Sequence, residues 1–164
     1  MNTGQTILTM GALILFSTLM VTMNASYQTS GDLIIQSELG ITASSLAISL
    51  IEEATAKAFD KSTDTAIAIS TSMLTQPQNL GPESGEVYPL FNDFDDYNNL
   101  TLTQNIDKMG IFQLKSNVEY VEFPTPDYPA SSPTWNKKLI VQVTNPEMID
   151  TVKMYYIFSY WYFR

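Results

Sequence analysis

No charged side chain precedes Asp32 in this chain. Within the uncharged stretch, residues 7–23 read ILTMGALILFSTLMVTM, and their apolar side chains fall on every side of a helix rather than along one stripe. Adding Thr6 and Asn24 brings the segment close to the ~20 residues that span the hydrocarbon core of a bilayer. The pattern predicts a helix that avoids water around its whole circumference.

Four interpretations of this segment compete. A cleavable secretory signal normally carries Lys or Arg before its apolar stretch, and none is present here. A buried core helix in a domain of this size is seldom so uniformly apolar. A single-span membrane anchor agrees with the pattern. A helix that serves first as an anchor and then as the core of a polymer is the fourth interpretation, and it depends on the residues that follow.

Those residues favour a longer helix, because no proline occurs before Pro77. The pattern predicts one helix from Thr3 to Phe59, with Ser30-Gly31 as the place where it bends or melts. A polar stripe is flanked on both sides by apolar rows, whereas a helix lying on a single domain needs only one apolar face. We therefore expect this helix to be buried twice, against its own domain and against another surface. The stripe is Glu38, Ser45 and Glu52, and the rows are Ile34, Ile41, Ile48 and Leu39, Leu46, Leu50.

Three later segments are typical of strands. Residues 110–123 alternate apolar and polar side chains, with Phe112, Leu114, Val118 and Tyr120 on one face. Residues 138–144 place Leu139, Val141 and Val143 on one face, and residues 152–163 form the third strand.

The intervening segments are predicted to be irregular. Residues 75–110 are rich in Pro, Gly, Asn and Asp and indicate a long loop with at most a short strand. Residues 124–136 contain four prolines and predict a loop. Thr65 to Leu74 fits either a strand or a last helical stretch.

The predicted fold class is α+β, with a long N-terminal helix whose C-terminal half packs on an antiparallel sheet of three or more strands. The expected division is a helix over 1–59 and a β head domain over 60–164. Within the helix, residues 1–31 form the membrane or filament core, and residues 32–59 pack on the head.

Both faces of the last predicted strand are aromatic, although a sheet covered by one helix should be polar on its open side. One interpretation is a central strand whose second face is covered by loops, and another is that this face meets neighbouring subunits; the two are compatible. One face carries Met154, Tyr156, Phe158, Tyr160 and Tyr162, and the other carries Tyr155, Ile157, Trp161 and Phe163.

Composition narrows the possible functions. The net charge of -9 argues against nucleic-acid binding, and we expect no such partner. Cysteine and histidine are both absent, which removes thiolate metal sites, cysteine nucleophiles and the usual general base. We therefore predict no catalytic residue, no enzymatic activity and no cofactor.

The order of these parts resembles the type IV pilin family, in which a long apolar N-terminal helix precedes an antiparallel sheet. The acidic segment 92–98, NDFDDYN, is similar to one found after the first helix in many bacterial prepilin-like proteins. The resemblance implies a structural subunit of a pilus-like, adhesive extracellular filament of identical chains, held in the cytoplasmic membrane before assembly. A major pilin, a minor pilin and a secretion-system pseudopilin are not separated by this pattern.

The N-terminus departs from the family pattern, which has a basic leader ending in Gly and Glu at the fifth mature position. Either Gly4-Gln5 is the processing junction and Thr9 takes that position, or Met1 is the mature residue and Gln5 takes it. No carboxylate is present in either case. The assembly residues implied by the resemblance are Gln5, Thr9, Leu13, Leu15, Phe16 and Leu19.

Three further sequence features concern metal binding, glycosylation and a pair of neighbouring glutamates. Some pilin-like proteins bind calcium beyond the helix, which makes Asp93, Asp95, Asp96 and Asn98 candidate ligands, although Asx turns explain the same residues. Asn99-Leu100-Thr101 is a glycosylation sequon. Glu52 and Glu53 are interpreted as a solvated helix face.

The alternative function is a single-span, membrane-anchored periplasmic or surface module whose β head binds a ligand.

Overall fold

The structure is a computed structural model that describes residues 2–160. It confirms an α+β fold with one long helix, α1 (Thr3–Thr55), and an antiparallel sheet of five strands. The chain forms two compact units, Met1–Glu38 and Leu39–Arg164, called here the N-terminal and C-terminal units. The predictions that concern Met1, and those for Trp161, Tyr162 and Phe163, lie outside the described residues.

Helix α1 continues without interruption through Ser30-Gly31, so the expected melting at that point is wrong. One glycine in a helix interior costs about 1 kcal/mol relative to alanine, and the cooperative hydrogen bonding of a long helix tolerates that cost.

The helix also ends earlier than expected, at Thr55 rather than Phe59. The chain leaves the helix so that Phe59 enters the core and Asp60 caps α2 (Lys61–Asp64). Beyond α2, Thr65 to Leu74 contains neither a strand nor an α-helix, and its only regular element is the short helix η1 (Thr71–Met73). Two further single-turn helices follow it, η2 (Pro77–Asn79) and η3 (Asp95–Tyr97).

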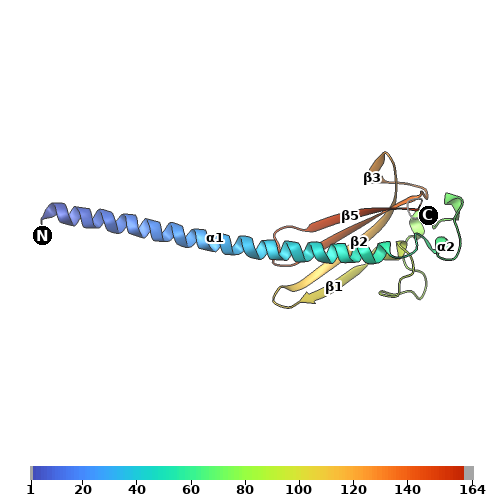
Figure 1. The fold of residues 1–164 in the computed structure, drawn as a ribbon, viewed down its shortest axis with the longest axis horizontal. Helices are drawn as coiled ribbons and strands as arrows, with labels where there is room; N and C mark the ends of the chain where they lie inside the picture. The colour runs from blue at the N-terminus through green and yellow to red at the C-terminus, as the bar shows by residue number, and fades with distance from the viewer. Residues whose placement is uncertain (1, 161–164) are drawn as a thin grey trace. The chain divides into compact units, whose positions relative to one another are not determined.

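The three predicted strands are present and pair with one another as expected for a meander, as β2 (Gly110–Glu122), β4 (Asn136–Thr144) and β5 (Val152–Ser159). The short strand allowed within the predicted loop is β1 (Thr101–Ile106), which pairs with the beginning of β2. The order across the sheet is β1-β2-β4-β5, and Figure 1 shows these strands side by side.

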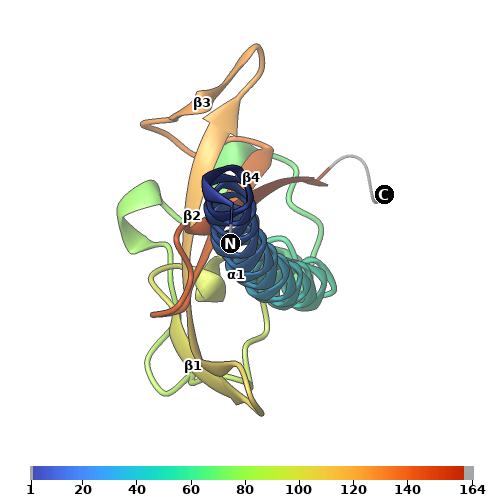
Figure 2. The same ribbon diagram turned by 90° about the vertical axis from the view of Figure 1, so that its left-hand side faces the viewer.

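The proline-rich segment contains a strand that sequence reasoning missed, β3 (Thr125–Pro129). Val121 pairs with Pro129 and Glu122 with Thr125, with a register shift between the two pairs. Proline is tolerated here because β3 pairs on one side only. β3 lies at the opposite end of β2 from β1 (Figure 2).

Strand β5 is at the end of the sheet order, so its interpretation as a central strand is wrong. Phe158 is buried, and Met154 and Tyr156 pack against the core from the same face. Tyr155, on the other face, is 71% exposed, so loops do not cover that face at this point.

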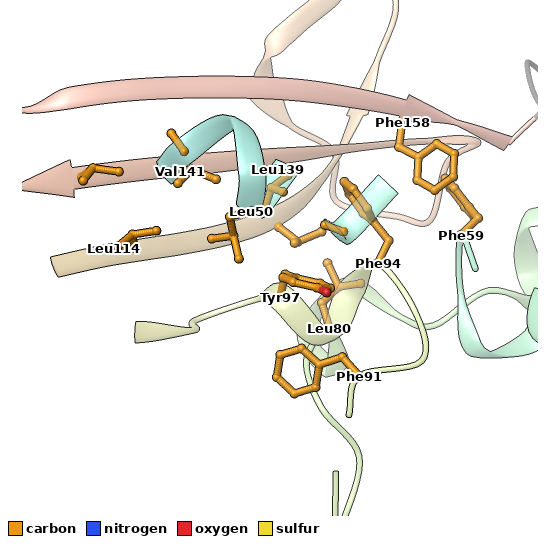
Figure 3. Packing of buried hydrophobic residues seen from close by; sticks show 14 of the residues in the cluster. Leu50, Phe59, Leu80, Phe91, Phe94, Tyr97, Leu114, Leu139, Val141 and Phe158 are labelled. Carbon is orange, nitrogen blue, oxygen red and sulfur yellow. The ribbon is translucent and has the colours of Figure 1, made fainter. Parts of the chain in front are cut away.

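The core of the C-terminal unit lies between one face of α1 and the inner face of the sheet (Figure 3). The buried helix residues are spaced three or four apart, as expected for one helical face, and three of the five are alanines. Alanine at the contact lets the helix backbone approach the sheet closely. The buried hydrophobic residues of this core are Leu39, Ala43, Ala47, Leu50 and Ala54 on α1, and Phe112, Leu114, Val118, Tyr120, Leu139, Val141, Val143 and Phe158 on the sheet.

The replacement Ala47→Leu should lower the free energy of unfolding by about 1–3 kcal/mol, because the extra methyl groups have no room in a packed core. The control Ser49→Leu, on the exposed side of the same helix, should change it by less than about 0.5 kcal/mol. Urea unfolding followed by near-ultraviolet circular dichroism measures both. Equal effects would contradict the close approach of α1 to the sheet.

Candidate functional site

The first candidate site is the surface of α1 in the N-terminal unit. Its large apolar side chains between Ile7 and Met23 are 46–75% exposed, and they occupy every side of the helix. By length and composition the helix can cross a membrane, a property it shares with signal sequences and with core helices. The predicted assembly residues Gln5, Thr9, Leu13, Leu15, Phe16 and Leu19 are all exposed in this unit.

The hydroxyl groups of this surface are satisfied by the helix itself. Thr6, Thr9, Ser17, Thr18 and Thr22 each donate to a backbone carbonyl three residues earlier, at 2.9 Å. A hydroxyl bonded in this way does not need water, so it is compatible with an apolar environment. The segment therefore presents no side-chain charge and few unpaired polar hydrogens to its surroundings.

Two modification sites predicted from the sequence are accessible. Gly4 and Gln5 are exposed in the first turn of α1, where the Gln5 amide donates to the Asn2 carbonyl at 2.9 Å. Asn99 is exposed immediately before β1, with a positive φ of 58°. Processing and glycosylation at these positions remain predictions.

The second candidate site is a buried charge cluster around Lys137 in β4. The Lys137 side chain is fully buried, and its Nζ donates to Asp60 Oδ2 and the Phe59 carbonyl, both at 2.8 Å, and to Asp95 Oδ1 at 2.5 Å. The ammonium also lies 4.7 Å from the centre of the Phe59 ring and 5.3 Å from that of Tyr120. One cation thus joins the sheet to the loop after α1 and to the acidic segment.

Asp60 is held in place on all sides. Its Oδ1 accepts from the Ser62 amide and hydroxyl as the cap of α2, and its Oδ2 accepts from the Thr75 amide at 3.0 Å. Tyr120 donates to the same Oδ2 at 3.3 Å and to the Thr75 carbonyl at 2.8 Å. Burial alone raises the pKa of Asp60, but the Lys137 ammonium and the amide hydrogen bonds from Thr75 and Ser62 outweigh it and hold the pKa below its usual range.

The acidic segment 92–98 organises its own backbone and binds the loop after α1. Asp93 Oδ1 accepts from the Asp95 amide, and Asp96 Oδ2 accepts from the amides of Asn92 and Asp93. The Phe94 amide donates to the Ala58 carbonyl at 2.9 Å. These contacts direct Asp95 toward Lys137.

Glu53 on α1 accepts hydrogen bonds from two tyrosines that lie far from it in the sequence, so its interpretation as part of a solvated face is wrong. Its two carboxylate oxygens accept from the Tyr88 hydroxyl at 3.1 Å and the Tyr97 hydroxyl at 2.8 Å. Burial, reinforced by the Glu53 carboxylate, raises the pKa of both tyrosines. Glu52, its neighbour, is exposed as expected.

The residues proposed as calcium ligands on the basis of the family resemblance lie together but mostly have other partners. Asp95 pairs with Lys137, and Asn98 uses both ends of its amide, donating to the Leu80 carbonyl and accepting from the Val118 amide. Asp93 and Asp96 each retain one buried carboxylate oxygen without a hydrogen-bond partner within residues 2–160.

Sequence reasoning missed Lys137, Asp60 and Glu53. A signal for Lys137 was present, because the period of two that places Leu139, Val141 and Val143 in the core also points Lys137 inward. The roles of Asp60 and Glu53 depend on partners far along the chain, which periodicity does not reveal.

The contacts of Lys137 are suited to a structural role, in which they fix β4 to the loop after α1 and to the acidic segment. Its ammonium is engaged by two carboxylates and a carbonyl, and it lies in the core beneath Phe59 and Tyr120. Charge-assisted hydrogen bonds of this kind fix relative positions strongly.

The replacement Lys137→Met should lower the free energy of unfolding by about 3–5 kcal/mol, because two carboxylates lose the cation that compensates their burial. The control Lys153→Met, at an exposed position of β5, should stay within about 0.5 kcal/mol of the unmodified chain. Thermal unfolding of the full chain in detergent distinguishes the two, and an unchanged midpoint for Lys137→Met would refute a stabilising role for the cluster.

The raised pKa of the Asp93 carboxyl predicts an unusual dependence of folding stability on pH. Burial and the neighbouring carboxylates Asp95 and Asp96 raise the pKa of Asp93 to about 9. The unfolded chain loses this proton near pH 4, so between these values the folded state binds the extra proton and Asp93 makes stability fall as pH rises.

Asp93→Asn imitates the protonated carboxyl, and it should raise the unfolding midpoint by about 3 °C or more at pH 8 and by less at pH 5. The control Asp107→Asn changes an exposed turn carboxylate and should show no such difference. Melting curves at the two pH values provide the measurement. A midpoint lowered equally at both would count against a protonated Asp93.

Comparisons with family models, with curated proteins and with solved structures found no match to this chain.

Proposed function

We propose that this chain is the structural subunit of a type IV pilus-like extracellular filament that polymerises through its N-terminal helix. The observation that carries the proposal is the uncharged apolar surface between Ile7 and Met23, which is exposed on every side. The proposed partners are further copies of the same chain, with the membrane as the environment before assembly.

Contact of this apolar surface with water is energetically unfavourable. Eleven large apolar side chains at ~1.5 kcal/mol each make exposure of the segment to water unfavourable by roughly 16 kcal/mol. Lipid and a bundle of identical helices both remove this surface from water, so transfer between the two changes the free energy little. One segment can therefore act as an anchor and later as the interior of a polymer.

A second support comes from the part of α1 in the C-terminal unit. Leu39 and Leu50 are buried there against the sheet, whereas Ile41 and Ile48 are 67% and 45% exposed. Of the two apolar rows that flank the polar stripe, one packs within the unit and the other has no cover. An uncovered row of isoleucines is the surface that a neighbouring subunit would bury.

In this proposal the residues near the N-terminus contact neighbouring subunits, although none of these residues carries a carboxylate. Gln5 or Thr9 offers a neutral oxygen to a neighbour's amine, which is a weaker interaction than an ion pair. Leu13, Leu15, Phe16 and Leu19 supply the apolar contacts. The same arrangement suits a pseudopilin of a secretion system.

One observation favours a second candidate, a membrane-anchored module that binds a ligand. The outer face of the sheet, opposite the core, has a groove of about 530 Å³ between β3 and strands β2, β4 and β5. Apolar and charged side chains line it together, including Tyr155, Ile157, Lys138 and Glu119. A groove of this size accommodates a small ligand.

Negative-stain electron microscopy of material sheared from the cell surface distinguishes the two. Regular fibres containing this chain support the filament, and detergent-soluble chains without fibres support the anchored module. The replacement Leu15→Arg should abolish fibres, because it places a charge on a helix surface that is buried in the polymer.

The matched control for this variant is Leu15→Met, which preserves apolar character and volume and should assemble normally. Immunoblotting of membranes confirms that both variants are produced. Normal fibres from Leu15→Arg would contradict a filament core formed by this helix.

A further inference from the structure

A turn beyond η2 places two glutamates beside the acidic segment. The Glu83 amide donates to Glu86 Oε2, and the Glu86 amide donates back to the Glu83 carbonyl, both at 3.0 Å. Gly85 adopts a φ of +97° within this turn, a conformation that favours glycine. Asn92 donates its side-chain amide to Glu86 Oε1, which joins the turn to the acidic segment.

Carboxylate oxygens from Glu83, Glu86 and Asp96 lie within 4.8 Å of one another. Asp96 is fully buried, and the two backbone amides that it caps both use its Oδ2. Its Oδ1 is buried with no hydrogen-bond partner among the described residues, and Glu83 Oε2 is in the same state. Two orphaned carboxylate oxygens in one cluster are costly unless a cation or a proton neutralises them.

Among the described residues, the cations near the cluster do not supply that neutralising charge. Lys61 Nζ reaches Glu83 Oε1 at 3.1 Å, but its side chain is largely exposed, and the contact engages the oxygen that is not orphaned. Lys137 is committed to Asp60 and Asp95. Three carboxylates with one peripheral lysine therefore leave an excess of negative charge.

We propose that Glu83, Glu86 and Asp96 bind a calcium ion. Calcium–oxygen distances of about 2.4 Å place ligands on opposite sides of the ion up to about 4.8 Å apart, and the oxygens of the cluster lie within this separation of one another. Magnesium, with distances near 2.1 Å, requires a tighter and strictly octahedral set. Waters and backbone carbonyls complete the coordination, as is usual for calcium.

This site differs from the one proposed from the family resemblance. It shares Asp96 with that earlier set, but it replaces Asp95 and Asn98, which have other partners, by two glutamates from a separate turn. The bound ion would join the turn at 83–86 to the acidic segment, and through it to the loop after α1. Calcium is thus expected to stabilise the folded C-terminal unit.

The test is isothermal titration of calcium chloride into the full chain in detergent, after treatment with a chelator. We expect one saturable site, weaker binding of magnesium, and a higher unfolding midpoint with calcium. Glu86→Gln keeps the length of the side chain and one of its two acceptor oxygens but removes its charge, and it should weaken calcium binding at least about tenfold. Glu83→Gln should do the same.

Glu52→Gln is the matched control, because Glu52 is an exposed glutamate outside the cluster, and its calcium affinity should equal that of the unmodified chain. Melting curves without calcium confirm that each variant folds. The proposal is overturned if the unmodified chain shows no saturable binding up to about 10 mM calcium, a concentration above the range of extracellular sites. It is equally overturned if both glutamine variants bind as tightly as the control, or if magnesium binds as tightly as calcium.

Discussion

The apolar surface of α1 between Ile7 and Met23 must stay out of water, and the proposed anchoring and assembly of the chain depend on that constraint. The segment has no charge to solvate, and its threonine and serine hydroxyls bond to the helix backbone. Nothing in the side chains favours an aqueous environment over an apolar one. The segment can therefore occupy either of two apolar environments, lipid or a bundle of identical helices. Both remove its surface from water to nearly the same extent.

In the C-terminal unit, the end of α1 is fixed to the sheet by close packing and by buried charges. Alanines let α1 approach the strands, and Lys137 then fixes the chain that follows the helix through Asp60 and the Phe59 carbonyl. The acidic segment supplies Asp95 to the same cation. Buried charges are expensive, and they are tolerated here because each compensates another in a defined geometry. The cost also makes the arrangement specific, since a displaced loop would leave Lys137 unpaired.

The strong periodicities in the sequence predicted the main elements. Uniform apolarity identified the N-terminal part of α1, and strict alternation identified β2 and β4 with their buried residues. β3 was missed because prolines forbid a central strand but not an edge strand, and sequence alone does not distinguish the two. The end of α1 was misplaced because Asp60 acts through Lys137 and Tyr120, partners far along the chain. The carboxylates that gather at Glu83, Glu86 and Asp96 come from two turns whose folding no local pattern describes.

The most direct test of the account is sedimentation analysis of the intact chain as detergent is removed. No monomer should survive, because the surface of residues 7–23 must be covered by lipid, detergent or other copies of the chain. Assembly into fibres or large oligomers would agree with this expectation. A stable, detergent-free monomer of 18.4 kDa that retains α1 would contradict it.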